Sequence, residues 1–210
     1  MPHNPLDHAS LADGVSFLSD LDPDLEKVIS KFGHPPLWSR EPGFSTLVHI
    51  ILEQQVSLAS AKAAFNKWKE ASESELTPDR FLRFSDAELK GFGFSRQKTE
   101  YCRELAKAVS NGDLELDKLH ELDDMEVRRE LIRIKGIGNW TASIYLLMAL
   151  LRPDVWPSGD LALKNGIQEI KNLSEYPDSE KCEEIAVQWK PWRAVAARIV
   201  WHHYLCRSIR

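Results

Sequence analysis

Two glycines one residue apart, Gly136 and Gly138, stand in the segment KGIGNWTA between two apolar runs. Glycine adopts positive φ and has no Cβ to keep another chain away, so the segment predicts a tight turn with accessible backbone amides. Asn139 is then the expected N-cap of a helix whose first N–H groups and positive dipole end attract anions. Taken alone, a G-x-G between two helices is more often a plain tight connection.

A carboxylate follows 20 residues after Trp140, in the segment RPDVWPSGDLAL. Asp160 comes after a Pro-Ser-Gly turn and directly before an apolar helix. At such a junction an aspartate caps the helix, and as a lone observation this structural reading is favoured. The same position also suits a carboxylate that faces a substrate beside Trp156.

The elements that must position these residues are predicted to be helices. Start and stop signals recur about every 15 residues, and no apolar alternation of period two continues beyond four residues. N-cap and proline signals are the pairs Asp22-Pro23 and Thr77-Pro78, and Ser85 with Glu88 fits a capping box. The sequence predicts an all-α fold of roughly ten short helices. Those with both ends marked cover 22–33, 44–52, 57–68, 95–111, 161–170 and 185–205.

Composition excludes several classes of protein. The 210 residues fit one large domain or two small lobes, and an apolar share of 43 % is ample for a core. No run of about 18 apolar residues predicts a membrane span, and the N-terminus does not resemble a signal peptide. The three cysteines (Cys102, Cys182 and Cys206) form no C-x-x-C pair, which argues against a zinc or iron–sulfur site.

Charge is unevenly spread along the chain. The net charge of −5 argues mildly against a nucleic-acid partner. Residues 113–126 are strongly acidic, whereas residues 128–135 and 190–210 are rich in lysine and arginine. Such polarity allows one face to bind a polyanion, although each run alone also fits a solvated helix face.

The glycine turn and the acid together resemble the helix-hairpin-helix DNA glycosylases, and within them the 3-methyladenine DNA glycosylase II group. Three further segments are similar to that group: FSTLVHIILEQQVSLASAKAA, GFGFSRQKTEYCRELA and WKPWRAVAARIVW. The resemblance covers about residues 43–205. It implies the all-α glycosylase fold of two helical lobes with a cleft between them. One lobe covers about 43–152 and contains the helix-hairpin-helix at 131–145; the other covers about 1–42 plus 153–210.

The resemblance also implies a reaction and a context for it. Asp160 would be catalytic, either stabilising an oxocarbenium ion on the sugar or activating a water. Trp140 stands where the family's glycosylase/lyases have the lysine that attacks the sugar, so a monofunctional hydrolase that leaves an abasic site is expected. The substrate would be duplex DNA with alkylated purines, above all 3-methyladenine and possibly 7-methylguanine. A monomer in a bacterial cytoplasm, or in a nucleus if the source is eukaryotic, is expected.

Base recognition is assigned to aromatic residues. An alkylated purine is cationic, and a cation over a tryptophan face gains roughly 0.5–2 kcal/mol. Trp140 and Trp201 match aromatic pocket positions of the group, although each also fits an ordinary core residue. Ile144 stands where relatives place a tyrosine, and Tyr145 would point about 100° away on a helix. This departure leaves hypoxanthine or 1-methyladenine open as alternative lesions.

DNA contacts follow from the same comparison. The hairpin residues Gly136, Ile137 and Gly138 would hold a phosphate through backbone amides, with Ile137 turned inward. Lys135, Gly93 and Lys98 are further candidate DNA contacts. Gln54 and Gln55 are candidates for the wedge that fills the gap left by a flipped base. No side-chain metal site and no iron–sulfur cluster are expected; a Na⁺ or K⁺ at the carbonyls of Lys135 and Ile137 is the one possible ion.

Two rival functions remain at this point. A helix-hairpin-helix DNA-binding module without catalysis would need no acid at the position of Asp160, and the acid is present. A glycosylase/lyase conflicts with Trp140.

Overall fold

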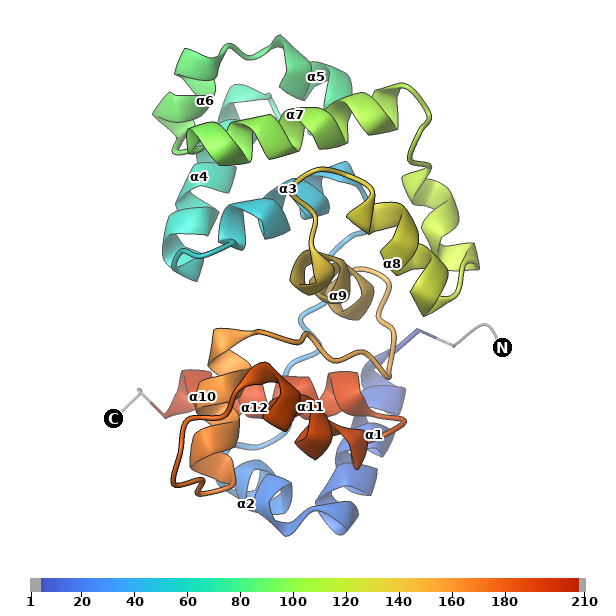
Figure 1. Cartoon of the computed structure of the whole chain (residues 1–210), viewed down its shortest axis with the longest axis vertical. Coiled ribbons are helices and arrows are strands. Elements are labelled where there is room, and N and C mark those ends of the chain that lie inside the picture. The colour runs from blue at the N-terminus through green and yellow to red at the C-terminus, as the bar shows by residue number, and fades with distance from the viewer. Residues whose placement is uncertain (1–4, 208–210) are drawn as a thin grey trace. The chain divides into compact units, whose positions relative to one another are not determined.

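The computed structural model describes residues 5–207, and within that range the chain is helical without any strand (Figure 1). The predicted all-α class is confirmed, with twelve α-helices and one 3₁₀-helix in the described range. Two compact units are present. One consists of the described residues up to Ser39 together with those from Leu146 onward, and the other of Arg40–Tyr145.

The helices divide between the units as follows. The first unit holds α1 (His8–Leu21), α2 (Pro23–Phe32), α10 (Leu161–Ile170), α11 (Ser179–Val187), α12 (Arg193–Cys206) and the end of α9 (Asn139–Met148). The second unit holds α3 (Phe44–Glu53), α4 (Leu58–Ala71), α5 (Pro78–Arg83), α6 (Asp86–Phe92), α7 (Arg96–Ser110), the 3₁₀-helix η1 (Leu116–Glu121), α8 (Asp124–Ile132) and most of α9.

Local capping chemistry explains where many helices begin. The Asp22 side chain caps α2 and Gly33 ends it, as predicted from the cap and proline signals. Thr77 caps α5 through the amide of Arg80. Ser85 and Glu88 form the expected capping box at α6, in which each side chain accepts from the other's backbone N–H.

Three predictions about helix bounds were incomplete or wrong. Helix α1 was not predicted, although Asp7 and Ser10 form a capping box at its start. The helix expected over 185–205 is two helices, because the segment between α11 and α12 contains Pro191, which has no N–H to continue the ladder. Asn139 is the first residue of α9, and the carbonyl of Gly138 accepts the first helical hydrogen bond, so Gly138 takes the N-cap position.

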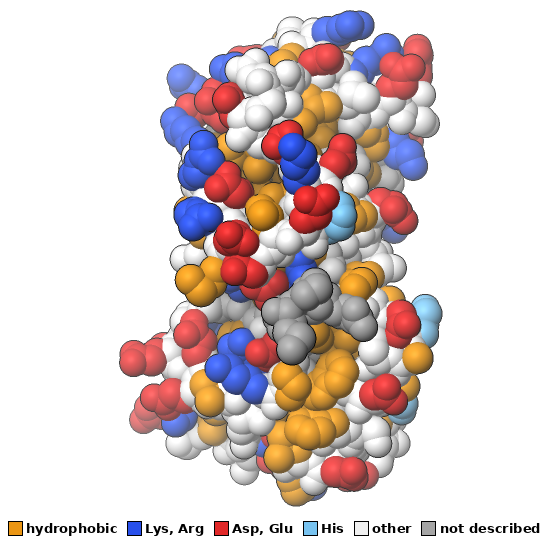
Figure 2. All heavy atoms as spheres, turned by 90° about the vertical axis from the view of Figure 1, so that its right-hand side faces the viewer, with side chains coloured by type: hydrophobic (Ala, Val, Ile, Leu, Met, Phe, Trp, Pro, Cys, Tyr) orange, Lys and Arg blue, Asp and Glu red, His pale blue; other side chains and the backbone are white. Residues whose placement is uncertain are grey.

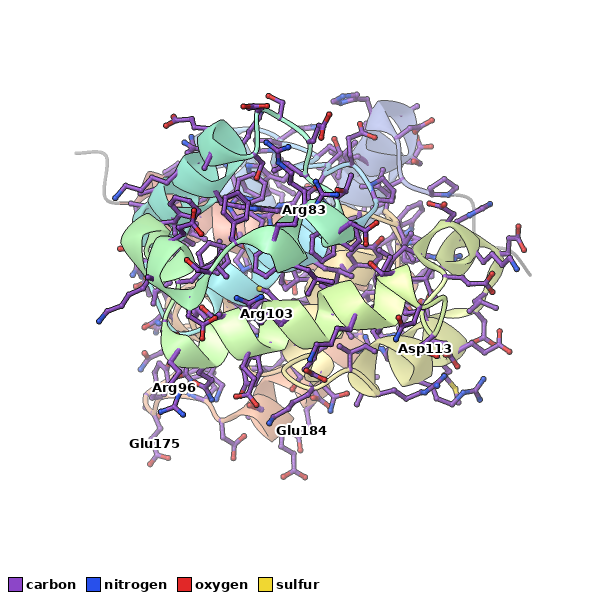
Figure 3. The ribbon with its side chains drawn as sticks, turned by 90° about the horizontal axis from the view of Figure 1, so that it is seen from above. Arg83, Arg96, Arg103, Asp113, Glu175 and Glu184 are labelled. Atoms are coloured by element: carbon purple, nitrogen blue, oxygen red, sulfur yellow. The ribbon has the colours of Figure 1, made fainter. Side chains whose placement is uncertain are left out.

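The second unit is built around an aromatic core. The fully buried ring of Trp68 on α4 meets Phe44, Phe81 and Phe94 edge-on at centroid distances of 5.5–6.5 Å. Figure 3 shows Arg103 on α7 between the two ends of that helix, on the side of α5. Its guanidinium donates to the carbonyl of Phe84 at 2.8 Å and thereby joins α7 to the end of α5.

The first unit packs around α12, whose residues from Ala194 to Trp201 are all buried. Helix α10 crosses α12 closely at Gly166, where a Cβ would lie 2.5 Å from Cγ1 of Val200. On the face that Figure 2 shows, hydrophobic side chains gather in a patch on this unit, and charged side chains lie beside the patch. Phe17 and Leu21 of α1 are among the large exposed apolar residues. No helix within residues 5–207 is long and apolar enough to cross a membrane.

A buried ion pair joins α2 to α10 in the first unit. The Asp22 carboxylate is 4 % exposed and accepts from Lys171 Nζ at 2.7 Å and from the Trp189 indole at 2.8 Å. Burial raises the pKa of Asp22, but the hydrogen bonds from Lys171 and Trp189 outweigh burial and lower it overall. Because the pKa is lowered on folding, this contribution is present above pH 4 and is lost as the pH falls through the folded value.

We expect Asp22→Asn to lower the free energy of unfolding by about 3 kcal/mol, because it removes the buried carboxylate and leaves the largely buried Lys171 ammonium with the more exposed Asp24 as its charged partner. Urea denaturation at pH 7 measures the loss. Asp24→Asn is the matched control: Asp24 also contacts Lys171, at 3.1 Å, but is more exposed, so a loss below about 1 kcal/mol is expected. Equal losses in the two variants would contradict the assignment of the stabilisation to the buried pair.

Candidate functional site

Asp160 lies at the start of α10, half-buried, after the turn that contains Gly159. Its Oδ1 accepts a hydrogen bond from the backbone N–H of Leu163 at 2.9 Å, which makes Asp160 the N-cap of α10. The same oxygen accepts a second hydrogen bond from the indole N–H of Trp201 on α12 at 3.1 Å. Donors from α10 and α12 therefore both fix the same carboxylate oxygen. Capping α10 alone would require only the first of these two hydrogen bonds.

Trp201 itself is held within the core of its unit. It ends the buried stretch of α12 and is 8 % exposed. The ring of Trp38 meets it edge-on at a centroid distance of 6.4 Å. Sequence reasoning missed Trp38, because it lies in an irregular segment outside every quoted motif and only the fold brings it to Trp201.

The glycine turn joins α8 to α9 in the second unit. Gly136 has φ of +93°, and a Cβ on it would overlap the Tyr101 ring, so the position requires glycine for two reasons. Ile137 is 3 % exposed and turns inward. Gly138 is exposed, and nothing lies within 4 Å of where its Cβ would be. The turn therefore presents backbone at Gly138 and packs it at Gly136.

The two candidate wedge residues have different positions. The side-chain amide of Gln54 donates to the carbonyl of Gly136 at 2.9 Å and to the Thr141 hydroxyl at 3.0 Å. Gln54 thus ties the end of α3 to the hairpin. Gln55 is exposed and has φ of +56°, a left-handed conformation that turns the chain between α3 and α4. Of the two candidate wedge residues, Gln55 is therefore the exposed one.

The candidate basic contacts already have protein partners. Lys98 Nζ donates to the carbonyl of Leu52, near the end of α3, at 2.6 Å, and burial lowers its pKa. Lys135 pairs with Glu100 at 2.6 Å on the surface, and this hydrogen bond raises the pKa of Lys135. Gly93 has φ of +108° and forms the left-handed C-cap of α6. Lys98 hence supports the α3–α4 turn, whereas Lys135 lies at the surface.

The candidate base-contacting residues of α9 follow one another by one helical turn. Trp140 is the second residue of α9 and is half-buried, and Ile144 is 3 % exposed. Tyr145 is fully buried; its hydroxyl accepts from the N–H of Gly43 at 3.0 Å, and burial raises its pKa to about 12. Tyr145 is therefore a core residue of its unit and does not take the place of the tyrosine missing at Ile144.

Side-chain clusters and the hairpin carbonyls are the two places where a metal ion could bind. Residues 5–207 contain no cluster of three His, Cys, Asp or Glu side chains suited to a metal ion. In the hairpin, protein donors engage the carbonyls of Ile134, Gly136 and Gly138. The intervening carbonyls of Lys135 and Ile137 are the pair to which the resemblance assigns a Na⁺ or K⁺.

The chain is similar to known DNA glycosylases. The DNA-3-methyladenine glycosylase of Bacillus subtilis (strain 168) is 28 % identical over 169 residues, which cover 75 % of this chain and 56 % of that protein. DNA-3-methyladenine glycosylase 1 of Schizosaccharomyces pombe is 27 % identical over 199 residues, or 91 % of this chain and 87 % of that protein. The chain therefore spans less than two thirds of the length of the Bacillus subtilis relative.

The solved structure of the Schizosaccharomyces pombe 3-methyladenine DNA glycosylase in complex with abasic DNA matches with a TM-score of 0.86 and 27 % identity. The match covers 90 % of this chain and 95 % of that one. The sequence model described as HhH-GPD superfamily base excision DNA repair protein matches residues 48–191. The resemblance noted in the sequence is thereby confirmed: the chain belongs to the HhH-GPD superfamily of base excision DNA repair proteins.

Proposed function

We propose that the protein is a monofunctional DNA glycosylase that removes alkylated purines, chiefly 3-methyladenine, from duplex DNA. The observation that carries the proposal is the Asp160 carboxylate, held by the N–H groups of Leu163 and Trp201 at a helix start. The relatives named as 3-methyladenine glycosylases support the substrate class. A non-catalytic DNA-binding module would have no need of this fixed carboxylate.

The chemistry is hydrolysis of the N-glycosidic bond. The C1′–N bond breaks and its electron pair leaves with the base, while water adds to C1′ and gives up a proton. Because an alkylated purine is already cationic, it leaves as a neutral base and needs little acid catalysis. The Asp160 carboxylate either stabilises the positive charge that develops on the sugar or accepts the proton from water.

The remaining candidate residues take supporting roles in this proposal. Backbone amides at Gly136 and Gly138 bind a DNA phosphate, a contact that positions DNA without reading its sequence. Gln55 occupies the gap left by the flipped base, and Gln54 keeps the hairpin in place. Aromatic faces of Trp140 and Trp201 favour an electron-poor base. A Na⁺ or K⁺ bound at the hairpin carbonyls would add a positive charge next to the phosphate.

Products distinguish hydrolysis from lyase chemistry. With duplex DNA that carries methylated purines, we expect free 3-methyladenine by chromatography and intact strands until alkali is added, because an indole at position 140 cannot form a Schiff base. Borohydride added during the reaction should trap no protein–DNA adduct. Strand cleavage without alkali, or a trapped adduct, would contradict the monofunctional assignment; no base release would contradict the glycosylase itself.

A further inference from the structure

Trp38 has an unusual backbone conformation for a large side chain. It follows Pro35, Pro36 and Leu37 in a segment without helix, and its φ is +48°. A bulky residue with positive φ is rare, costs free energy, and persists only where the surroundings fix it. The family model begins at residue 48, so Trp38 lies outside the part of the chain that the family match covers.

A buried arginine holds Leu37, the residue before Trp38, in place. Arg198 of α12 is fully buried, and its Nε donates to the carbonyl of Leu37 at 2.8 Å. The same guanidinium donates to the carbonyls of Ala194 at 3.0 Å and Leu147 at 2.8 Å. Burial lowers the pKa of Arg198 to about 10, so it remains a cation at neutral pH and its hydrogen bonds are charge-assisted.

The Trp38 ring lies against the residues that follow Arg198 on α12. Its centroid is 6.4 Å from that of Trp201 at an interplanar angle of 69°, and 6.3 Å from that of His202 at 60°. Both are edge-to-face contacts, which favour one relative orientation of the rings. The Trp201 indole in that orientation donates its N–H to Asp160 Oδ1 at 3.1 Å.

We infer that Trp38 is a positioning residue for the proposed reaction: its ring holds the Trp201 indole in the orientation in which the N–H donates to Asp160. The inference rests on the proposed role of Asp160. Arg198 fixes the Leu37 carbonyl, the left-handed turn directs the Trp38 ring, and the ring restricts rotation of Trp201. Without the Trp38 ring, Asp160 still accepts from the Leu163 N–H, but the Trp201 N–H is no longer held in place as a second donor. Because a misplaced reacting group lowers the rate of a reaction, base release should slow.

The test deletes the ring without adding backbone strain. Asn and Gly both tolerate positive φ, so Trp38→Asn and Trp38→Gly remove the indole while suiting the turn, and the comparison does not depend on one variant folding. Trp38→Phe keeps an aromatic ring as the conservative variant. Phe32→Leu is the matched control, because Phe32 meets His202 and His203 edge-on from the same unit.

Two measurements are made on each folded variant. The Trp201 indole N–H resonance, assigned by its disappearance in Trp201→Phe, should move upfield and exchange faster in Trp38→Asn and Trp38→Gly. The single-turnover rate of base release should fall about tenfold in both, with the affinity for abasic duplex DNA unchanged. The rate of base release by Trp38→Phe should stay within about threefold of the wild-type rate. Phe32→Leu should match wild type in both measurements.

An unshifted Trp201 resonance in both ring deletions would overturn the inference, and so would a shifted resonance with an unchanged rate. A wild-type protein that releases no base would instead overturn the proposed function, while the resonance would still report whether Trp38 orients Trp201.

Discussion

Asp160→Asn should lower the single-turnover rate of base release by about 10²- to 10⁴-fold, the contribution that a positioned acid or base makes to such reactions. The amide is neutral, so it neither stabilises a sugar cation as a carboxylate does nor accepts a proton from water. The substitution keeps an oxygen that can cap α10 through the N–H of Leu163, and Asn is as good an N-cap as Asp. We therefore expect a folded protein that binds abasic duplex DNA with nearly wild-type affinity.

Asp178→Asn is the control for this prediction. Asp178 caps α11 in the same unit and accepts from the N–H of Lys181 at 2.8 Å, so the two variants make the same chemical change at the same kind of position. We expect the base-release rate of Asp178→Asn to equal that of the wild type. Undiminished release by Asp160→Asn, or an equal loss in the two variants, would remove Asp160 from the reaction.

Local signals made much of the fold predictable from sequence. The starts of α2, α5, α6 and α7 lie where a Ser, Thr or Asp side chain caps the first turn, a contact made within three residues along the chain. Helix α1 was missed because its capping pair, Asp7 and Ser10, is not the usual Ser/Thr with Glu/Gln pattern. Lobes were expected from the resemblance, not from any local signal.

The candidate site was predictable only where a motif names a residue. Adjacent glutamines look equivalent in sequence, yet Gln54 contacts the carbonyl of Gly136, 82 residues away, and Gln55 is exposed. Likewise the Lys98 ammonium is engaged by the Leu52 carbonyl, a contact across 46 residues. Such long-range hydrogen bonds depend on the packing of helices, which periodicity does not specify. The same limit explains why Trp38 was not found.

Alanine at the two hairpin glycines should affect different properties: stability at Gly136 and DNA affinity at Gly138. At Gly136 a Cβ would lie 2.5 Å from the Tyr101 Cβ and still closer to its Cγ, next to the backbone of α7, and φ is +93°. Overpacking costs about 1–3 kcal/mol and a left-handed alanine about 1–2 kcal/mol, so Gly136→Ala should lower the free energy of unfolding by about 4 kcal/mol. Urea denaturation measures this loss.

Gly138→Ala should leave the fold intact, because the site of the new methyl group is open and φ is not positive. The loss of an N-cap glycine should cost less than about 1 kcal/mol. The methyl group would instead lie where a DNA phosphate has to approach the hairpin amides, so affinity for abasic duplex DNA should fall about tenfold, which is about 1.4 kcal/mol. Fluorescence anisotropy at fixed salt measures this affinity. Wild-type affinity in a fully folded Gly138→Ala protein would show that DNA does not contact the hairpin backbone there, whereas an unfolded one would show that Gly138 serves packing as Gly136 does.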